Sequence, residues 1–189
     1  MQKHTSASEL ESLELVMWMI NRYDLLRSST ASRATLLVSA NTFLLTGTAL
    51  LLTVYGNARP NEPSWLSIAF IGFFFATISA ILASIWDCVS AIAAQKTSRS
   101  VTPSAIPSRF AFNWGDTLKE VSTFSDFSTR LTEANLQDKL GFAVSELWTA
   151  INQHKRKHRH LRRGVRLFRI SLLLFLILTT FSLIRRFIS

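Results

Sequence analysis

Residues 35–86 read TLLVSANTFLLTGTALLLTVY, then GNARPNEPS, then WLSIAFIGFFFATISAILASIW. The first block, 35–55, has 21 residues and the last, 65–86, has 22, and neither block contains a charged side chain. About 20 apolar residues in a helix are enough to cross the hydrocarbon core of a bilayer. The link of nine residues, 56–64, contains two prolines, which favours a turn. Residues 35–86 therefore predict a transmembrane hairpin of two antiparallel spans.

A third apolar block lies near the C-terminus. Residues 170–184 read ISLLLFLILTTFSLI, which is short for a span. The flanking arginines can reach the headgroups with their long side chains, which extends the block to about 167–188. We expect a third span here, with a helix docked on the bilayer or on a partner as the alternative.

The third span is expected to continue a long helix that begins at residue 135. Asn135 has the position of an N-cap, with Asp138 three residues later. Apolar residues then recur on one helical face: Leu136, Leu140, Ala143, Leu147 and Ile151. Residues 135–188 are thus predicted to form one long helix that runs through a basic juxtamembrane tract into the last span.

The composition supports a membrane protein. The chain has 189 residues, of which 48% are hydrophobic and only 17% are charged. A disordered chain would be poorer in apolar residues, and an ordinary soluble domain would be about 25% charged. Cys88 is the single cysteine, so no disulfide can form within the chain. The expected fold class is an all-α integral membrane protein.

The remaining segments are polar. Residues 1–34 are predicted to form a cytosolic amphipathic helix that starts at Ser8, because Ser8 and Glu11 have capping-box spacing. Its apolar face, Leu10, Leu13, Met17 and Ile20, either packs on the rest of the protein or lies in the membrane interface. Residues 87–134 are expected to form a cytosolic segment with a Ser- and Pro-rich loop at 97–108, followed by short helices.

The basic residues predict the orientation in the membrane. Residues 1–34 contain four Lys or Arg, the turn at 56–64 contains only Arg59, and residues 87–169 contain fourteen. Cytosolic loops are enriched in Lys and Arg. The N-terminus and residues 87–169 are therefore expected to be cytosolic, and the turn is expected to face outside.

Much of the net charge of +9 comes from one tract, because residues 154–169 contain eight Lys or Arg and no acid. Since this tract runs into a span, contact with anionic lipid is the favoured interpretation. The alternatives are that the tract binds a small anionic ligand or a nucleic acid. Of these two, nucleic acid is not expected as a partner. The tract also contains His154, His158 and His160, but no metal site is expected among so many cations. The residues expected to contact lipid are Lys155, Arg156, Lys157, Arg159, Arg162 and Arg163.

Small and hydroxyl-bearing residues recur at helical spacing in both hairpin spans. Such a stripe lets helices pack closely, and in an oligomer it could instead line a path for water. Asn41 is the only side-chain amide in the three spans, and we expect it to bond a neighbouring helix. The residues predicted to form the stripe are Thr35, Ser39, Asn41, Thr42, Thr46, Gly72 and Ala76.

Residues 109–130 read RFAFNWGDTLKEVSTFSDFSTR and mix aromatic with polar residues. Aromatic rings can stack on a nucleobase, cations can hold a phosphate, and an amide or carboxylate can bind a base edge. A small packed core with solvated charges is the alternative. The candidate ligand-binding residues are Arg109, Phe112, Asn113, Trp114, Asp116, Lys119 and Arg130. The sequence contains no Walker loop, GxSxG or HExxH motif, so we expect neither an enzyme nor a cofactor.

Three stretches of the sequence resemble the membrane effectors of bacterial Pycsar anti-phage systems. Residues 33–37, RATLL, with Asn41 beyond them, resemble the family's entry into its first span. Residues 112–117, FNWGDT, resemble its cytosolic Phe-rich stretch, and residues 143–148, AVSELW, with LRRG at 161–164, resemble its final cytosolic helix. The likeness covers about 33–184, with one departure at Ala31, where members of the family often have Asp.

The resemblance implies a function. A partner cyclase would make cyclic CMP or cyclic UMP on infection, and the effector would respond by breaching the bacterial inner membrane and causing abortive infection. The effector would act as a homo-oligomer, because one hairpin alone cannot enclose a pore. The alternative is a non-gated membrane anchor or adaptor that docks a cytosolic partner through residues 88–160.

Overall fold

The structure, a computed structural model, describes residues 2–55, 64–93 and 108–188, and within them it contains five helices and no strand. Three helices are long and apolar enough to cross a membrane, so the predicted all-α membrane fold is confirmed. The helices are α1 (Gln2–Tyr55), α2 (Ser64–Ile92), α3 (Trp114–Glu120), α4 (Phe124–Glu133) and α5 (Leu136–Ile188). The predicted turn at 56–64 and loop at 97–108 lie outside the described residues, except for Ser64 and Ser108.

Helix α1 is unbroken from Gln2 to Tyr55, so it contains both the predicted amphipathic helix and the first span. The prediction that the helix starts at Ser8 is wrong. The Ser8 carbonyl instead accepts a hydrogen bond from the Ser12 hydroxyl, 2.8 Å away, inside the helix. Residues 2–7 contain no Gly or Pro that would end a helix, so α1 extends past the capping-box pattern.

Side-chain caps start the three later helices. The Asn113 side chain accepts hydrogen bonds from the backbone N–H groups of Gly115 and Asp116 at the start of α3. Thr123 caps α4 in the same way. At α5 the predicted Asn135 cap is confirmed, because its side chain accepts from the Asp138 N–H at 2.7 Å. Each cap satisfies backbone donors that the first turn of a helix leaves without a partner.

The described residues form two compact units, and α1 and α5 contribute to both. Unit 1 comprises Met1–Ser28 and Ala94–Lys155, and unit 2 comprises Ser29–Ala93 and Arg156–Ser189. The segment limits expected from the sequence follow its composition, whereas the two units follow contacts between residues. As domain limits, the expected segments stay a prediction: 1–34, 35–86, 87–134 and 135–188.

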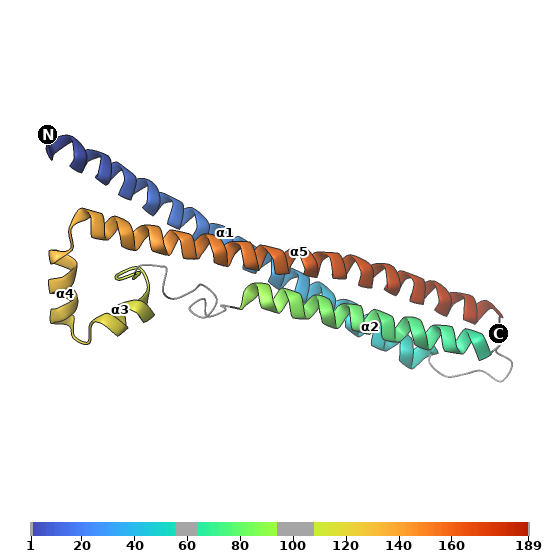
Figure 1. Cartoon of the computed structure of the whole chain (residues 1–189). Coiled ribbons are helices and arrows are strands. Elements are labelled where there is room, and N and C mark those ends of the chain that lie inside the picture. The colour runs from blue at the N-terminus through green and yellow to red at the C-terminus, as the bar shows by residue number, and fades with distance from the viewer. Residues whose placement is uncertain (1, 56–63, 94–107, 189) are drawn as a thin grey trace. The chain divides into compact units, whose positions relative to one another are not determined.

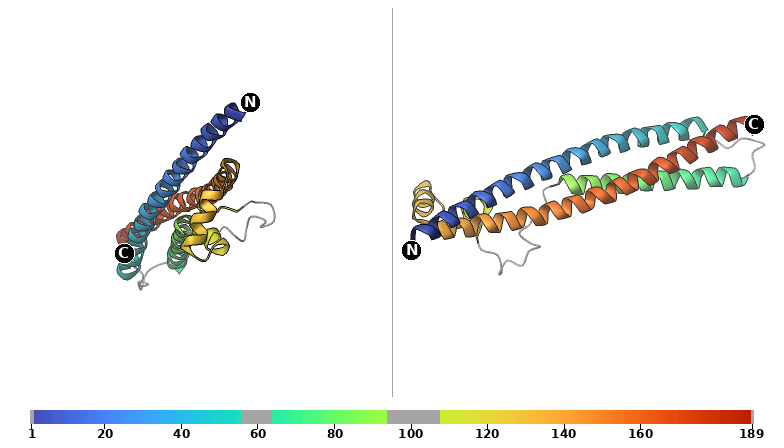
Figure 2. Two further views of the ribbon diagram at one scale, coloured as in Figure 1. Left: turned by 90° about the vertical axis from the view of Figure 1, so that its left-hand side faces the viewer. Right: turned by 90° about the horizontal axis from the view of Figure 1, so that it is seen from above.

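Unit 2 is a bundle of three helices, in which α2 lies alongside parts of α1 and α5 (Figure 2). One apolar cluster joins Ala34 of α1 with Cys88 and Ala91 of α2 and Leu161 of α5. A second cluster joins Phe70 and Phe74 of α2 with Leu178 of α5, and Leu51 of α1 packs against it. Because contacts along α2 run in the opposite chain direction to those along α1 and α5, α2 is antiparallel to both. The predicted hairpin is therefore present in unit 2.

Unit 1 contains α3 and α4, which follow one another beside the first turns of α5 (Figure 1). Ile20 of α1 packs with Ala143 and Leu147 of α5, and other α1 residues pack against them: Leu13, Val16, Met19 and Tyr23. The N-terminal helix thus packs on the protein, as one of its two interpretations expected. Its predicted apolar face is partly wrong, because Leu10 and Met17 are exposed.

A separate aromatic group anchors α4 in unit 1. Phe110 is fully buried, and its ring lies 5.6 Å from that of Phe127 and 5.8 Å from that of Phe142. The Arg130 guanidinium lies over the same ring, 5.0 Å from its centre. Phe110 belongs to the turn before α3, so its burial fixes that turn against α4 and α5.

Candidate functional site

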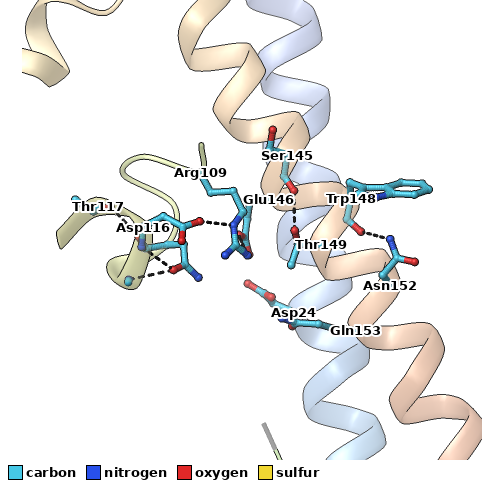
Figure 3. Close-up of polar contacts among 12 residues, drawn as sticks. Asp24, Arg109, Asp116, Thr117, Ser145, Glu146, Trp148, Thr149, Asn152 and Gln153 are labelled. Carbon is cyan, nitrogen blue, oxygen red and sulfur yellow. Dashed lines mark hydrogen bonds and ion pairs between the residues drawn. The ribbon is translucent and has the colours of Figure 1, made fainter. Parts of the chain in front are cut away.

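The Arg109 side chain is the centre of a charged cluster in unit 1 (Figure 3). Its Nε donates to Asp116 Oδ2 of α3 at 2.7 Å, and its guanidinium lies 3.5 Å from Glu146 Oε2 of α5. Only 12% of the Arg109 side chain is exposed. Figure 3 shows Arg109 reaching from its turn toward α5, with Asp116 on one side and Glu146 on the other. A single guanidinium thus connects the turn, α3 and α5.

The backbone next to Arg109 has an unusual conformation. Ala111 has a φ of 67°, in the left-handed region that residues with a side chain rarely adopt. The turn is held by hydrogen bonds from the backbone N–H groups of Phe112 and Asn113 to the Arg109 carbonyl, at 3.0 and 2.9 Å. The Ala111 N–H donates to the Thr117 hydroxyl at 3.0 Å. These bonds hold a strained turn that sets the direction of the Arg109 side chain.

A second arginine extends the cluster onto α1. Arg27 donates to Gln153 of α5 and pairs with Asp24 one turn away on α1. Burial lowers the pKa of Arg27, and the charge of Glu146 partly opposes this. The cluster therefore combines two guanidinium groups with three carboxylates, drawn from α1, the turn at Arg109, α3 and α5.

Glu146 is the least well compensated member of the cluster. Burial raises the pKa of its carboxyl above the ordinary value, while Arg109 and Arg27 lower it and Asp116 raises it again. Among the described residues, its Oε2 atom has no hydrogen-bond partner, although Arg109 lies 3.5 Å away. A buried carboxylate oxygen without a hydrogen bond costs free energy, so the negative charge of Glu146 is only partly compensated in this cluster.

The structure brings three of the seven candidate ligand-binding residues together: Arg109, Asp116 and Asn113, which caps the same helix. Phe112 instead packs against the core cluster of unit 1. Arg130 pairs with Glu120 and covers Phe110. Trp114 is 81% exposed and Lys119 is also exposed, and neither contributes to the charged cluster. Binding of a ligand by these residues stays a prediction.

Sequence reasoning missed three members of the cluster, Asp24, Arg27 and Glu146, and the Gln153 side chain that accepts a hydrogen bond from Arg27. A signal for two of them was present. Glu146 follows Ala143 by three positions, and Arg27 follows Ile20 by seven, so both lie in register with the packed faces of their helices. A base and an acid on two facing apolar stripes predict a buried ion pair, and this pattern could have identified them.

Unit 2 contains a polar connection between its three helices. The Asn41 amide nitrogen of α1 donates to Ser84 Oγ of α2 at 3.0 Å, and Ser84 donates to the Gly164 carbonyl of α5 at 3.0 Å. All three residues are buried. This confirms that Asn41 bonds a neighbouring helix. Such bonds favour one alignment of the helices, because in hydrocarbon a polar group needs a partner.

The other stripe residues are not covered by the rest of unit 2. Thr35, Ser39, Thr42 and Thr46 are exposed, and each donates its hydroxyl to the carbonyl four residues earlier in α1. Gly72 and Ala76 of α2 are exposed too. These residues do not pack α1 against α2, so their predicted role in packing or in lining a path concerns contacts outside a single chain.

Some residues of the basic tract at 154–169 contact α2, and others are exposed. Lys157 donates to the Ile92 carbonyl at the end of α2, 3.2 Å away, and His160 contacts Asp87 of α2 at 2.8 Å. Arg156 is half-buried. The other residues expected at lipid are exposed: Lys155, Arg159, Arg162 and Arg163. Part of the tract thus fastens α5 to α2, and lipid contact by the exposed residues stays a prediction. Within the described residues, no group of three His, Cys, Asp or Glu could hold a metal ion.

Three helices that are long and apolar enough to cross a bilayer, together with a compact unit that contains buried charges, define a membrane protein. A search of protein families identifies residues 18–184 as a Pycsar effector protein domain. The match covers most of both units, and the chain belongs to this family. No curated protein and no solved structure matches the chain. The chain is therefore a membrane-located Pycsar effector with a role in anti-phage defence.

Proposed function

We propose that this effector responds to a cyclic pyrimidine nucleotide, cyclic CMP or cyclic UMP, made by a partner cyclase during infection. The response disrupts the integrity of the bacterial inner membrane, and the infected cell dies before phage can spread. The observation that carries the proposal is the family match, because it spans both the candidate membrane helices and the charged unit. In this proposal the chain acts as a non-enzymatic effector that needs no cofactor.

The proposed arrangement places unit 1 in the cytosol. The N-terminus and residues 87–169 contain most of the basic residues, and the positive-inside tendency assigns them to the cytosolic side. A cytosolic unit 1 would meet a nucleotide made in the same compartment. Its charged cluster offers two guanidinium groups, which suit a phosphate. The exposed Trp114 offers a ring on which a base can stack.

The mechanism that we propose is a shift between a resting and a conducting arrangement. A ligand can shift this equilibrium only if it binds the conducting arrangement better. Disruption needs several copies, because one bundle of three packed helices encloses no path. The uncovered Thr and Ser residues of α1, with Gly72 and Ala76 of α2, are the face that we expect to meet another copy.

Dye uptake by intact bacteria tests this function. Cells that express the chain are given either an active cyclase or a catalytically dead one, and entry of a membrane-impermeant dye is followed. We expect entry only with the active cyclase. Equal entry with both cyclases would show a membrane effect without gating. No entry with either one, from protein shown to be inserted, would favour the adaptor that docks a partner through residues 88–160.

A further inference from the structure

The charged cluster of unit 1 contains one more negative charge than positive charges. Its carboxylates are Asp24, Asp116 and Glu146, and its guanidinium groups are Arg27 and Arg109. Asp116 accepts a hydrogen bond from Arg109, and Asp24 accepts one from Arg27. Glu146 is therefore the surplus anion, paired with Arg109 at 3.5 Å and influenced by the charge of Arg27.

The Oε2 atom of Glu146 is held by charge rather than by a hydrogen bond. This atom is 3.5 Å from Arg109, and among the described residues it accepts no hydrogen bond. Only 13% of the Glu146 side chain is exposed, so water compensates little of its charge. A carboxylate in this position is easier to replace than one with two good hydrogen bonds, because less free energy is lost when it leaves.

We infer that Arg27 and Arg109 form the phosphate-binding pair for the ligand, and that Glu146 occupies this place in the unliganded chain. A cyclic phosphodiester and a carboxylate both present two oxygens that share one negative charge. Exchange of one for the other keeps the charge of the cluster unchanged. Guanidinium groups bind both anions through paired hydrogen bonds. This inference rests on the proposed response to a cyclic nucleotide, and it assigns the anion site within that function.

The exchange would reach α5 directly. Glu146 lies on α5, the helix whose later residues form the third candidate span. The ion pair with Glu146 connects Arg109, and so the strained turn that contains Ala111, to α5. When a phosphate takes the place of the carboxylate, this connection is lost and α5 is released from the turn. The ligand thereby favours an arrangement of α5 that the resting chain disfavours.

Competition with Glu146 makes ligand affinity depend on pH. The charged groups that act on Glu146 are Arg109 of the turn, Arg27 of α1 and Asp116 of α3. The arginines stay protonated at any ordinary pH. As the pH falls through the raised pKa of Glu146, its carboxyl becomes neutral and no longer attracts the two arginines electrostatically. Affinity for a phosphodiester, which stays ionised, should therefore rise.

The test is calorimetric titration of the full-length protein in detergent with cyclic CMP and cyclic UMP, at neutral and at mildly acidic pH. Glu146→Gln keeps the shape of the side chain and removes its charge, and Glu133→Gln removes an exposed carboxylate of α4 as the matched control. We expect E146Q to tighten Kd by about tenfold, which is about 1.4 kcal/mol. E133Q should leave Kd unchanged.

The pH series keeps the inference testable even if E146Q fails to fold. Affinity of the unmodified protein should rise toward acidic pH, and in E146Q this rise should be absent. A Kd in E146Q that is equal to or weaker than that of the unmodified protein, or an affinity that does not rise toward acidic pH, would overturn the inference and leave the proposed function standing. If no cyclic nucleotide binds the unmodified protein, the proposed function is wrong and the inference falls with it.

Discussion

Glu146 shows what a single buried charge contributes to this chain. Its pKa is raised in the folded state, mainly by burial, so its folded pKa lies above the unfolded one. The stability that it contributes is fully present below the unfolded pKa and is lost as the pH rises through the folded pKa. We predict that the unfolding temperature of the protein falls from mildly acidic to neutral pH, and that E146Q reduces this fall. Thermal unfolding of both proteins measures it, and an identical pH profile would contradict the prediction.

Ala111 is the second residue whose environment predicts an effect. Its φ of 67° strains any residue with a Cβ by roughly 1 kcal/mol or more. Glycine relieves that strain, so we predict that Ala111→Gly leaves stability equal or raises it by up to about 1 kcal/mol. Ala134 has an ordinary φ of −60°, so the matched change Ala134→Gly should destabilise. Chemical denaturation of the two variants gives the comparison, and a larger loss in A111G than in A134G would speak against a strained turn.

Two interactions of single asparagine side chains agree with the predictions from the sequence. The cap at Asn135 and the helix bond of Asn41 were predictable, because both depend on local spacing or on the lack of water in a membrane. The partners of Arg109 were not predictable from the stretch 109–130 alone. One of them, Glu146, lies on another helix, and only packing brings the two together.

Helix α5 approaches α2 closely at Gly164 in unit 2. Among the described glycines, Gly164 leaves the least room for a Cβ atom. A Cβ placed on Gly164 would lie 2.7 Å from Cys88 Sγ and 3.5 Å from the Ser84 carbonyl oxygen. We predict that Gly164→Ala destabilises the bundle by about 1–3 kcal/mol through overpacking. Cys88→Ala removes the clashing sulfur, so the double variant should recover part of that loss.

Thermal stability of the four proteins in detergent (unmodified, G164A, C88A and the double variant) measures this coupling. Gly72 supplies the control, because a Cβ there would meet nothing within 4 Å in the described part of the chain. Gly72→Ala should therefore be tolerated in the isolated chain. If C88A fails to recover any stability in G164A, the close approach of α5 to α2 is not what Gly164 permits.

The uncovered face of α1 gives an element-scale prediction about assembly. Thr46 is exposed and its hydroxyl already bonds the Thr42 carbonyl at 3.0 Å. If this face packs against another copy, bulk matters more than the hydroxyl. We predict that Thr46→Leu lowers ligand-driven leakage severalfold, while Thr46→Val, of nearly the same size, keeps it. Equal loss in both variants would show that the hydroxyl is required, as in a path for water.

Elements differed in how far the sequence predicted them. The three apolar helices were predictable because their length and lack of charge match a bilayer. The continuity of α1 from Gln2 to Tyr55 was not, since amphipathic and apolar stretches were read as separate segments. The stripe of small and hydroxyl-bearing residues at 35–46 stays a prediction, because its spacing does not say whether its partner is in the same chain.

For the whole molecule, two compact units share two long helices. The family match covers residues 18–184, and so it includes the charged cluster, the basic tract and most of the three candidate spans. We propose that the charged cluster of unit 1 senses the ligand and that unit 2 disrupts the membrane. α5 contributes Glu146 to one unit and Gly164 to the other, so the two functions that we propose would depend on the same helix.

Leakage from liposomes that contain only the purified protein is the most direct test that a cyclic nucleotide makes this chain disrupt a membrane. The vesicles enclose a small dye and receive cyclic CMP, cyclic UMP, their purine counterparts or cyclic dinucleotides separately. We predict that a cyclic pyrimidine mononucleotide causes release of the dye and that the other classes cause none. Release without any nucleotide, or no release with all of them from protein shown to be folded and inserted, would contradict it.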